Sequence, residues 1–565
     1  MSRISTTAGL RQNKNHTGRN GMKTKQLFLT GLATAVLSAC GGGDGGSTAP
    51  TTTTAAPAAT RISGTAAVGA ALGNAAVQAK CASGSGTATT AADGSFTISI
   101  EGATRPCVLS VTAPDGTTLH SVVEAGTGTT ATANITPLTE LVTASLAQGN
   151  TDAFFEQFDA NAQARLTSDN VTSAIGAVRL VLTGVVDLSS IDPVKDPLVA
   201  ANGANAGNAQ DQLLDQLGDR LEASKTTLAE LSSAVAANAG AAAVQTALQP
   251  AAATCAGLKT GKYHVVELGT PIGEAGEMDA ATLQFKLGTD VTTFTADASE
   301  ACRFTAGTDT VLVSKSGLSV VLPPAGTVNR LPALLIPAQA LALADLAGDW
   351  NGLGYERDGP SPYAASRVNF SLDAAGKVTA GADCSGLDSC SAWLPDEFPT
   401  ITLNPDGGLN LTEQDGGVER AYAFKGTDGQ LVIVFTHGDG FTMATRRIAR
   451  ALPAVGATSS FWDTSILPVD SNSATADGIS TTTASTVKVT AVDAQANTYT
   501  RERDDGRVDT WKVNTPLDGL RYRAPTPNNS GGSEAISMSI GNTGLNVAIG
   551  VNTARRFFSI SVNRL

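Results

Sequence analysis

The side chains best suited to acid–base chemistry are few in this sequence. Four histidines occur, His16, His120, His264 and His437. A serine hydrolase needs such a base, oriented by a carboxylate. However, the sequence contains no Gly-x-Ser-x-Gly elbow, no His-Glu-x-x-His, no P-loop and no Gly-x-Gly-x-x-Gly at a strand–helix junction. We interpret His437, before Gly438-Asp439-Gly440, as a hairpin-end residue, His264 as a rim or cross-strand residue and His120 as solvent-facing. No catalytic residue is therefore assigned.

Clustered carboxylates are the next candidates for chemistry, because calcium prefers oxygen ligands. Asp504, Asp505 and Asp509 lie close together, and Asp406 and Asp428 each precede a glycine. None of them follows an EF-hand or RTX spacing, and turn geometry accounts for the Asp-Gly pairs. The sequence therefore predicts no metal site and no cofactor.

Aromatic side chains offer a different function, because they stack on sugars or line apolar pockets. The β-rich part contains, among others, Trp350, Tyr355, Tyr363, Trp393, Trp462 and Trp511. Trp393, Trp350 and Tyr355 are the candidate ligand-binding residues. Trp393 is preferred because Ser391–Pro395 follows a short Cys384–Cys390 loop that would hold the ring in place. The alternative is that these rings form the barrel core and that Trp393 lies beneath the loop.

Seven cysteines occur. Six remain when Cys40 is set apart, and an even number in an oxidising compartment predicts three disulfides. Position along the chain pairs Cys81 with Cys107, Cys255 with Cys302, and Cys384 with Cys390. Zinc is the rival interpretation, but no Cys-x-x-Cys occurs and neither Cys384 nor Cys390 has a neighbouring histidine.

Cys40 ends the run Leu37-Ser38-Ala39-Cys40. Lys23 and Lys25 form a cationic segment before a short apolar stretch from Leu27 to Leu37, which is typical of a secretory signal and too short for a membrane-spanning helix. The run resembles the lipobox of bacterial lipoprotein signals. This resemblance implies that Cys40 is acylated and becomes the mature N-terminus. The alternative is a plain secreted protein whose signal ends at a cysteine.

Residues 1–39 are therefore excluded from the fold, and we expect translation to start at Met22. They carry six Lys/Arg and no Asp/Glu, so the full-chain net charge of −13 becomes −19 in the 526 remaining residues. So acidic a chain excludes nucleic acid as a partner and leaves the acyl chains as the contact with the membrane. Gly41 stands where an inner-membrane retention aspartate would lie, which favours the outer membrane.

Residues 40–60 form the lipidated cysteine and a flexible Gly/Thr/Ala/Pro tether. Short alternating strands with Asp-Gly turns then predict an antiparallel β-sandwich over residues 61–136. The runs ISGTAAVGAALGNAAVQAKC and TTAADGSFTISI resemble carboxypeptidase-regulatory-like (transthyretin-like) modules. That resemblance implies a non-catalytic structural or binding module.

Over residues 137–250 the apolar residues recur about every 3.6 positions instead of at every second position, which predicts a helical connector. Thr136 with Pro137 starts the first helix, Thr167 or Ser168 caps a second, and a third is expected from Asn208 to Ala237. We interpret the apolar stripes as bundle core, with a partner-binding groove as the alternative. The order ANITPLTEL, helices, AQDQLLDQL resembles uncharacterised proteobacterial lipoproteins.

The rest of the chain is all-β by pattern, with predicted units at 251–335, 336–453 and 454–565. Asp-Gly pairs recur at 406, 415, 428 and 439, an interval typical of an up-and-down meander or barrel. A weak repeat places Gly261-Lys262-Tyr263, Gly348-Asp349-Trp350 and Ser460-Phe461-Trp462 before similar strands. LAGDWNG resembles the opening of lipocalin-like barrels. The predicted fold class is multidomain and mainly β, with an N-terminal antiparallel sandwich, a helical connector and C-terminal antiparallel barrel-like domains.

These observations predict a non-enzymatic lipoprotein of the cell outer membrane. It is anchored by its acyl chains and surface-exposed or periplasm-facing, and it acts as a binding or structural module. Its expected partners are an envelope protein, a glycan or a small apolar ligand. Two alternatives stay open: a secreted hydrolase of polysaccharide or polyester with its site in the β region, and a lipocalin-like or haem-binding carrier of a small ligand.

Overall fold

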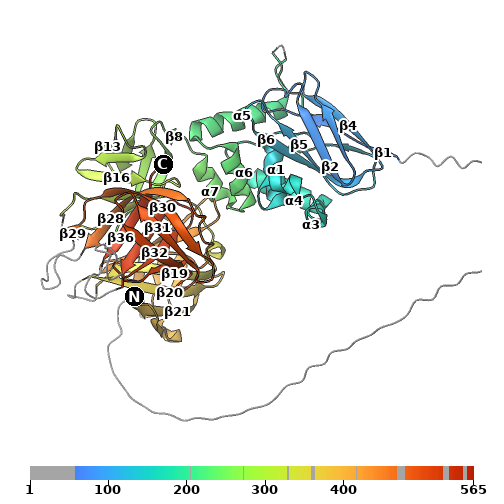
Figure 1. The fold of residues 1–565 in the computed structure, drawn as a ribbon. Helices are drawn as coiled ribbons and strands as arrows, with labels where there is room; N and C mark the ends of the chain where they lie inside the picture. Colours follow the sequence, from blue (N-terminus) through green and yellow to red (C-terminus); the bar gives the residue numbers. More distant parts are fainter. Residues whose placement is uncertain are drawn as a thin grey trace, which may run out of the picture. The chain divides into compact units, whose positions relative to one another are not determined.

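The computed structural model describes residues 58–203, 205–271, 273–327, 330–357, 363–414, 416–467, 478–525, 533–551 and 557–565. The chain is mainly β, with 46% of residues in strands and 16% in helices, and the helices lie in the middle of the sequence (Figure 1). The predicted fold class is thus confirmed. The lipobox and the tether up to residue 57 lie outside the described residues. Among the helices of the described residues, none is long and apolar enough to span a membrane.

The N-terminal sandwich consists of two small sheets, with strand orders β4-β1-β7 and β3-β2-β5-β6. The strands are β1 Ala59–Thr65, β2 Ala76–Ser83, β3 Ser85–Thr89, β4 Ser95–Glu101, β5 Thr104–Thr112, β6 Thr118–Val123 and β7 Thr130–Thr132. Phe96, Ile98 and Ile100 alternate inward along β4, as predicted. One pair departs from the antiparallel prediction, because β7 returns beside β1 in parallel. The Cys81–Cys107 disulfide joins β2 to β5.

Among the described residues of the next region, seven α-helices follow: α1 Pro137–Ala147, α2 Thr151–Glu156, α3 Ala160–Ala164, α4 Ser168–Val181, α5 Ala209–Ser224, α6 Leu228–Ala236 and α7 Gly240–Ala247. Thr136 caps α1 with Pro137 in its first turn, and Thr167 caps α4. The single predicted helix from Asn208 to Ala237 is wrong. It breaks at Lys225, which adopts a left-handed conformation, and Thr227 caps a new helix.

The sandwich and the helices share one apolar core. Helices α1 and α2 pack on strand β6, so the face of β6 that the sequence pattern left to solvent is covered. Val142 of α1 and Val178 of α4 are both fully buried in this common core. The helical region is therefore the second wall of the sandwich core and not a free-standing connector.

The β-rich remainder contains a two-stranded sheet (β8 Ala251–Ala252, β9 Cys255–Lys259) and three nine-stranded antiparallel sheets. We call the sheets the first, middle and C-terminal barrels. The first barrel comprises β10 Gly261–Glu267, β11 Gly273–Asp279, β12 Gln284–Leu287, β13 Asp290–Thr293, β14 Thr295–Ala296, β15 Arg303–Ala306, β16 Asp309–Val313, β17 Ser319–Leu322 and β18 Ala333–Pro337. Cys255 and Cys302 form the second predicted disulfide.

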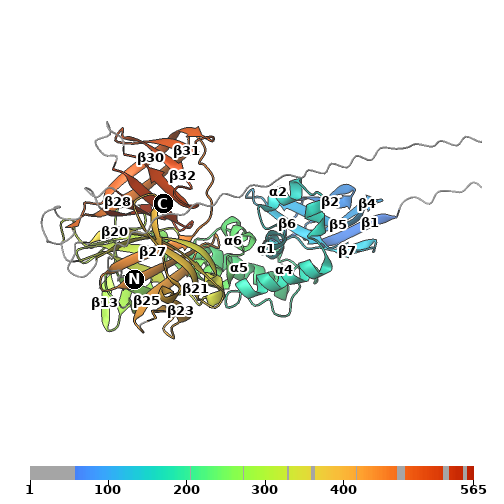
Figure 2. The same cartoon turned by 90° about the horizontal axis from the view of Figure 1, so that it is seen from below.

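The middle barrel comprises β19 Gly348–Glu356, β20 Ala364–Leu372, β21 Val378–Ser385, β22 Ser389–Ala392, β23 Thr400–Leu403, β24 Leu409–Thr412, β25 Val418–Lys425, β26 Leu431–His437 and β27 Gly440–Arg446. The C-terminal barrel comprises β28 Thr458–Leu467, β29 Gly478–Ile479, β30 Thr483–Asp493, β31 Thr498–Arg503, β32 Val508–Val513, β33 Leu520–Arg523, β34 Ala535–Ile540, β35 Leu545–Gly550 and β36 Phe558–Asn563. Figure 2 shows these strands in yellow to red.

All three barrels follow one plan, in which the first long strand hydrogen-bonds to the last. β10 pairs with β18, β19 with β27, and β28 with β36. The weak sequence repeat marks these first strands, since Tyr263, Trp350 and Trp462 lie in β10, β19 and β28. In the C-terminal barrel β28 also pairs with β30, which closes the ring. The outward faces of all three barrels meet in one apolar core.

Candidate functional site

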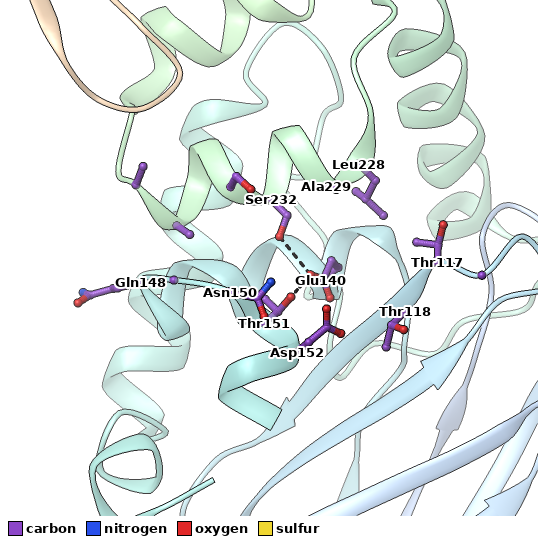
Figure 3. Close-up of a pocket in the computed structure, with 15 residues that line it drawn as sticks. Thr117, Thr118, Glu140, Gln148, Asn150, Thr151, Asp152, Leu228, Ala229 and Ser232 are labelled. Atoms are coloured by element: carbon purple, nitrogen blue, oxygen red, sulfur yellow. Dashed lines mark hydrogen bonds between the residues drawn. The ribbon is translucent and has the colours of Figure 1, made fainter. Parts of the chain in front are cut away.

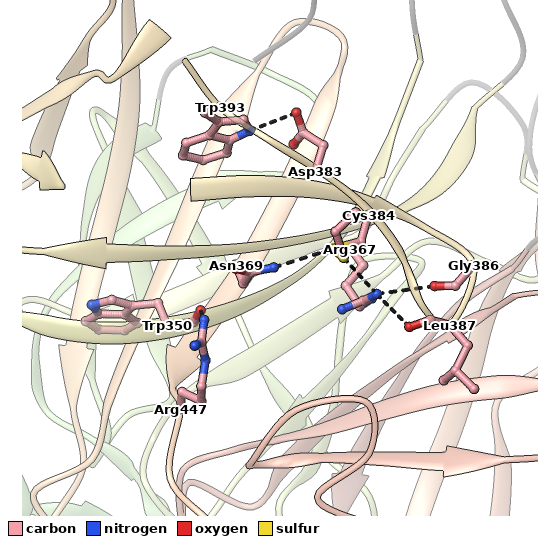
Figure 4. The surroundings of a disulfide bond; sticks show 10 residues. Trp350, Arg367, Asn369, Asp383, Cys384, Gly386, Leu387, Trp393 and Arg447 are labelled. Atoms are coloured by element: carbon pink, nitrogen blue, oxygen red, sulfur yellow. Dashed lines mark hydrogen bonds between the residues drawn. A yellow bond between two sulfur atoms is a disulfide. The ribbon is translucent and has the colours of Figure 1, made fainter. Parts of the chain in front are cut away.

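The disulfide-clamped loop of the middle barrel was the first candidate site. Cys384 and Cys390 are bonded across the β21–β22 hairpin, so all three predicted disulfides are confirmed. Trp393 follows β22 and folds back over Gly381, with its side chain in the barrel core and only 9% of the residue exposed. Its Nε1 donates to Asp383 Oδ2 at 2.8 Å (Figure 4). Trp393 therefore packs beneath the loop.

The other two aromatic candidates are buried as well. Trp350 has no exposed surface, stacks on Phe370 with ring centroids 6.0 Å apart, and donates from Nε1 to the carbonyl of Leu346. Tyr355 is also fully buried and stacks on Tyr363 at 5.3 Å. Both rings therefore lie in core, as the alternative interpretation of these aromatics has it, because both faces of strand β19 are covered.

The described histidines occupy three different environments. His437 ends β26 and faces Glu356 at 3.9 Å, in agreement with its predicted place at a hairpin end. His264 lies in β10 and its ring is 4.9 Å from that of Tyr422. His120 contradicts the prediction of a solvent-facing residue, because α1 and α2 cover β6 and leave it 1% exposed.

The carboxylates considered for calcium are occupied by other partners. Asp505 pairs with Arg507, and Asp504 accepts a hydrogen bond from the backbone N–H of Thr486. Asp509 is buried among three arginines. Guanidinium groups at these distances repel a cation, so this cluster does not fit calcium. Within the described residues, no group of three or more His, Cys, Asp or Glu side chains has the arrangement of a metal site.

A pocket of about 550 Å³ opens beside the buried His120, at the edge of the sandwich (Figure 3). Its walls come from the turn before β6, from the α1–α2 connection and from α6. The lining residues are Gly116, Thr117, Thr118, Glu140, Gln148, Gly149, Asn150, Thr151, Asp152, Leu228, Ala229, Ser232, Ser233, Ala236 and Ala237. Most of them carry hydroxyl, amide or carboxylate groups, and Leu228 with the alanines forms an apolar strip along α6.

Glu140 forms the floor of this pocket and connects four elements. Its Oε2 accepts hydrogen bonds from the backbone N–H of His120 at 2.8 Å and lies 2.9 Å from His120 Nδ1. Its Oε1 accepts from Thr151 at 2.7 Å and from Ser232 at 3.1 Å. Each oxygen of the buried carboxylate thus has two partners, which is the condition for burying a charge at low cost. Glu140 therefore holds β6, α1, α2 and α6 together.

Asp152 is the more available carboxylate of the pocket. Its side chain is 63% exposed, and its Oδ1 lies 3.6 Å from His120 Nε2, a nitrogen that is buried without a hydrogen-bond partner among the described residues. Asn150 caps α2 beside it by accepting from the Ala153 N–H. The lining, all within the described residues, contains two carboxylates and no Lys or Arg. It suits a neutral or cationic ligand with many hydroxyl or amino groups.

Sequence reasoning missed this site because its residues come from four separate elements. One signal was present: Glu140 lies in the run ANITPLTEL, the segment that resembles other lipoproteins. An acidic residue in the first turn of a helix is ordinarily explained by the helix dipole. Only the covering of β6 turns Glu140 into a buried partner of His120.

Comparisons with known proteins add little to this geometry. No protein-family model matches the chain. No curated protein matches it. One similar solved structure is a protein of unknown function from the DUF3598 family of Nostoc punctiforme PCC 73102, 10% identical, with 40% of this chain and 98% of that chain covered and a TM-score of 0.15. Another is the vaccine antigen Transferrin Binding Protein B of Haemophilus parasuis Hp5, in a double mutant, 8% identical, with 55% and 96% covered and a TM-score of 0.17. Likenesses at these TM-scores carry no argument about function.

Proposed function

We propose that this protein is a non-enzymatic lipoprotein of the outer membrane, anchored through an acylated Cys40, that binds a saccharide-like polar ligand in the pocket beside Glu140. The observation that carries the binding proposal is the pocket itself, a cavity of about 550 Å³ lined by hydroxyls, amides and two carboxylates. The lipobox at Leu37–Cys40 carries the proposed anchoring.

A saccharide fits the pocket better than the other partners expected from the sequence. Thr117, Thr118, Asn150 and Ser233 offer donors and acceptors to hydroxyl groups, while Leu228 and its neighbouring alanines offer an apolar strip to a sugar's C–H face. A small apolar ligand would leave the polar groups of this lining unpaired, which is costly. The floor is already ordered by the hydrogen bonds of Glu140, so little entropy is lost when a ligand binds.

A glycan array probed with the acyl-free Cys40→Ser chain tests the binding proposal, with calorimetry on each saccharide that is retained. Ser233→Trp places a large ring in the pocket from an exposed position on α6 and is expected to abolish binding. Ser173→Trp makes the same change at an exposed position of α4 outside the pocket and is the control. Binding that survives Ser233→Trp, or an array without any retained glycan, would refute the proposal.

The anchoring proposal has its own measurement. Cells that express the chain are fed a clickable fatty-acid analogue, and the wild type is expected to be labelled and to sediment with outer membranes. Cys40→Ser is expected to lose both the label and the sedimentation. Labelling of the Cys40→Ser chain, or an unlabelled wild type, would contradict anchoring at this cysteine without affecting the pocket.

A further inference from the structure

The interior of the C-terminal barrel combines a small apolar cluster, formed by Val489, Tyr499, Trp511, Val513 and Ala535, with several arginines. Strand register places Arg501 opposite Asp509, Tyr499 opposite Trp511, and Val513 opposite Arg521. Because strand side chains alternate between faces, these residues share one face of the sheet. The same register assigns further residues to that face, namely Phe461, Asp463, Val487, Val489, Arg503, Arg523, Ser537, Ser539, Ser559 and Ser561.

Contacts of the opposite face show that this one points inward. Phe558 lies on the other face and packs against Phe441 of the middle barrel, with ring centroids 4.8 Å apart. Trp462 and Met538 belong to the same shared core between the barrels. Side chains of strands that are not direct neighbours also meet on this face. Arg521 of β33 donates to the Tyr499 hydroxyl of β31 at 2.9 Å, as expected on the concave side of the sheet. The arginines therefore line the lumen.

One carboxylate serves three of these arginines. Asp509 Oδ1 lies 2.8 Å from Arg501 Nε, while Oδ2 lies 3.7 Å from Arg523 Nη1 and 3.9 Å from Arg503 Nε. Trp511 also donates to Asp509 from Nε1. Only the Arg501 contact has the geometry of a direct hydrogen bond. Arg503 and the Nη1 group of Arg523 thus face a carboxylate that Arg501 already holds, while Nε and Nη2 of Arg523 donate to the carbonyl of Ser533 at 3.0 and 2.9 Å.

The positive charge of the lumen exceeds its negative charge. On the inward face of the strands, four arginines, at 501, 503, 521 and 523, stand with two aspartates, Asp463 and Asp509, which gives these strand residues a net charge of +2. Asp463 is engaged elsewhere, accepting hydrogen bonds from Ser559 and Ser561 at 2.9 and 2.8 Å. This excess lies inside a chain whose total charge is −13.

Uncompensated charge in a half-buried position is costly, because desolvation disfavours the charged form. Burial accordingly lowers the pKa of Arg503 and of Arg523, and in Arg503 the neighbouring Arg501 lowers it further. Burial would raise the pKa of Asp509, but the arginines, Arg501 foremost, outweigh this and lower it. Among the described residues, the Arg503 guanidinium donates no side-chain hydrogen bond; it lies over the Phe461 ring at 5.5 Å.

Solvent still reaches these groups. The side chains of Arg501, Arg503 and Arg523 are 13%, 11% and 13% exposed. Trp511 lies below them, with the guanidinium carbons of Arg501, Arg521 and Arg523 at 5.3, 5.5 and 5.0 Å from its ring. Fixed guanidinium groups around an aromatic platform are the donors that phosphate and carboxylate groups require.

We propose that the lumen of the C-terminal barrel is an oxyanion-binding site, in which Arg503 and Arg523 hold a phosphate or carboxylate group above Trp511. The group is either a free oxyanion or the anionic end of a larger ligand. This site goes beyond the proposed function, since it lies in another part of the fold and selects the opposite charge from the pocket beside Glu140.

Calorimetry on the full chain carrying Cys40→Ser, in a low-salt buffer free of oxyanions, tests this site. Inorganic phosphate and phenyl phosphate are the two probes. Both are expected to bind and to raise the melting temperature. Tighter binding of phenyl phosphate identifies the site as a receptor for the end group of a larger ligand, and equal binding identifies it as a site for the free oxyanion.

Arg503→Gln is the decisive variant because this side chain makes no hydrogen bond whose loss would unfold the barrel. It is expected to weaken phosphate binding about tenfold or more, the effect of losing a charge-assisted hydrogen bond. Arg503→Lys keeps the charge and is expected to retain part of the affinity. Arg357→Gln changes a half-exposed arginine of the middle barrel, paired with Asp439, and is the control. A wild type that binds neither probe, or equal binding by wild type and Arg503→Gln, would overturn the proposal.

Discussion

The middle and C-terminal barrels share a strand plan and differ in what fills them. In the middle barrel the lumen is apolar, and Trp350, Phe370 and Phe435 form a chain of ring contacts at 6.0 and 5.7 Å. In the C-terminal barrel the tryptophan of the lumen, Trp511, belongs to a smaller apolar cluster, and three guanidinium groups also lie over its ring. Their outward faces are alike, since both contribute large apolar side chains to the core between the barrels.

This difference indicates which face of each sheet maintains the fold. The outer faces bury apolar surface against neighbouring barrels, so they carry much of the hydrophobic stabilisation that a small barrel ordinarily obtains from its interior. The interior of the C-terminal barrel is then free to hold charge. Since a strand exposes alternate residues to its two faces, the interior can change from apolar to charged without any change of register.

Trp350→Ala is expected to have the largest effect on stability. It removes a fully buried indole from the lumen of the middle barrel and leaves a cavity, which costs about 3–5 kcal/mol of unfolding free energy. Urea denaturation measures the loss, with Val418→Ala on the exposed part of β25 as a control expected within about 0.5 kcal/mol of wild type. Phosphate is expected to restore none of the loss, because the cavity is apolar. A loss below about 1 kcal/mol would contradict the packed interior of this barrel.

Asp509→Asn examines the charged lumen in the same way. It removes the carboxylate that three arginines share, and breaking a buried ion pair by removing one partner costs about 3 kcal/mol. In contrast to Trp350→Ala, this loss is expected to be partly recovered when phosphate is added, because an anion takes the place of the missing charge. Thermal unfolding with and without phosphate measures the recovery.

Asp505→Asn is the matched control for that experiment, since its exposed pair with Arg507 contributes little. An Asp509→Asn chain as stable as wild type would show that solvent already screens the positive charge of the arginines. The two lumens would then differ only in composition and not in how they respond to charge.

The sequence predicts the repeated features of this fold and misses the unique ones. Asp-Gly turns and alternating strands predicted barrels, because such turns are local and need no tertiary context. A repeat that ends in an aromatic residue marked the first strand of each barrel, and the disulfide partners were identified by their neighbourhood in the chain. Each of these signals is confined to a short segment.

The candidate sites depend on how distant segments come together, which no local pattern records. Strand alternation places His120 on the opposite face of β6 from its immediate neighbours. That face is buried only because helices cover it, and the same helices bring Glu140 next to His120. Of the candidate aromatics, Trp350 and Trp393 are buried inside the middle barrel and Tyr355 in the core between the barrels, and neither kind of burial can be predicted from a single strand. The arginines of the lumen were passed over because each lies in an ordinary alternating strand, and their convergence on Asp509 requires the closed ring.

The smallest expected effect concerns pH and separates the apolar interface from the charged lumen. His264 is buried at the interface of the first and middle barrels, against Tyr422. Burial lowers its pKa below the ordinary value of 6.5; Asp406 opposes this shift and Arg420 adds to it. The unfolded chain therefore binds a proton near pH 6.5 while the folded chain does not, so stability falls as the pH drops through 6.5 and stops falling at the folded pKa.

Within that window the loss is at most about 1.4 kcal/mol per pH unit. His264→Gln is expected to remove this slope. Asp509 acts in a different window, because its pKa is lowered from 3.8 and its contribution is present above that value and lost only as the pH falls further. Denaturant titrations from pH 7.5 to 5, compared between wild type and His264→Gln, then isolate the contribution of the interface. A slope that persists in His264→Gln and vanishes in Asp509→Asn would reverse the assignment and place the acid-sensitive charge in the lumen.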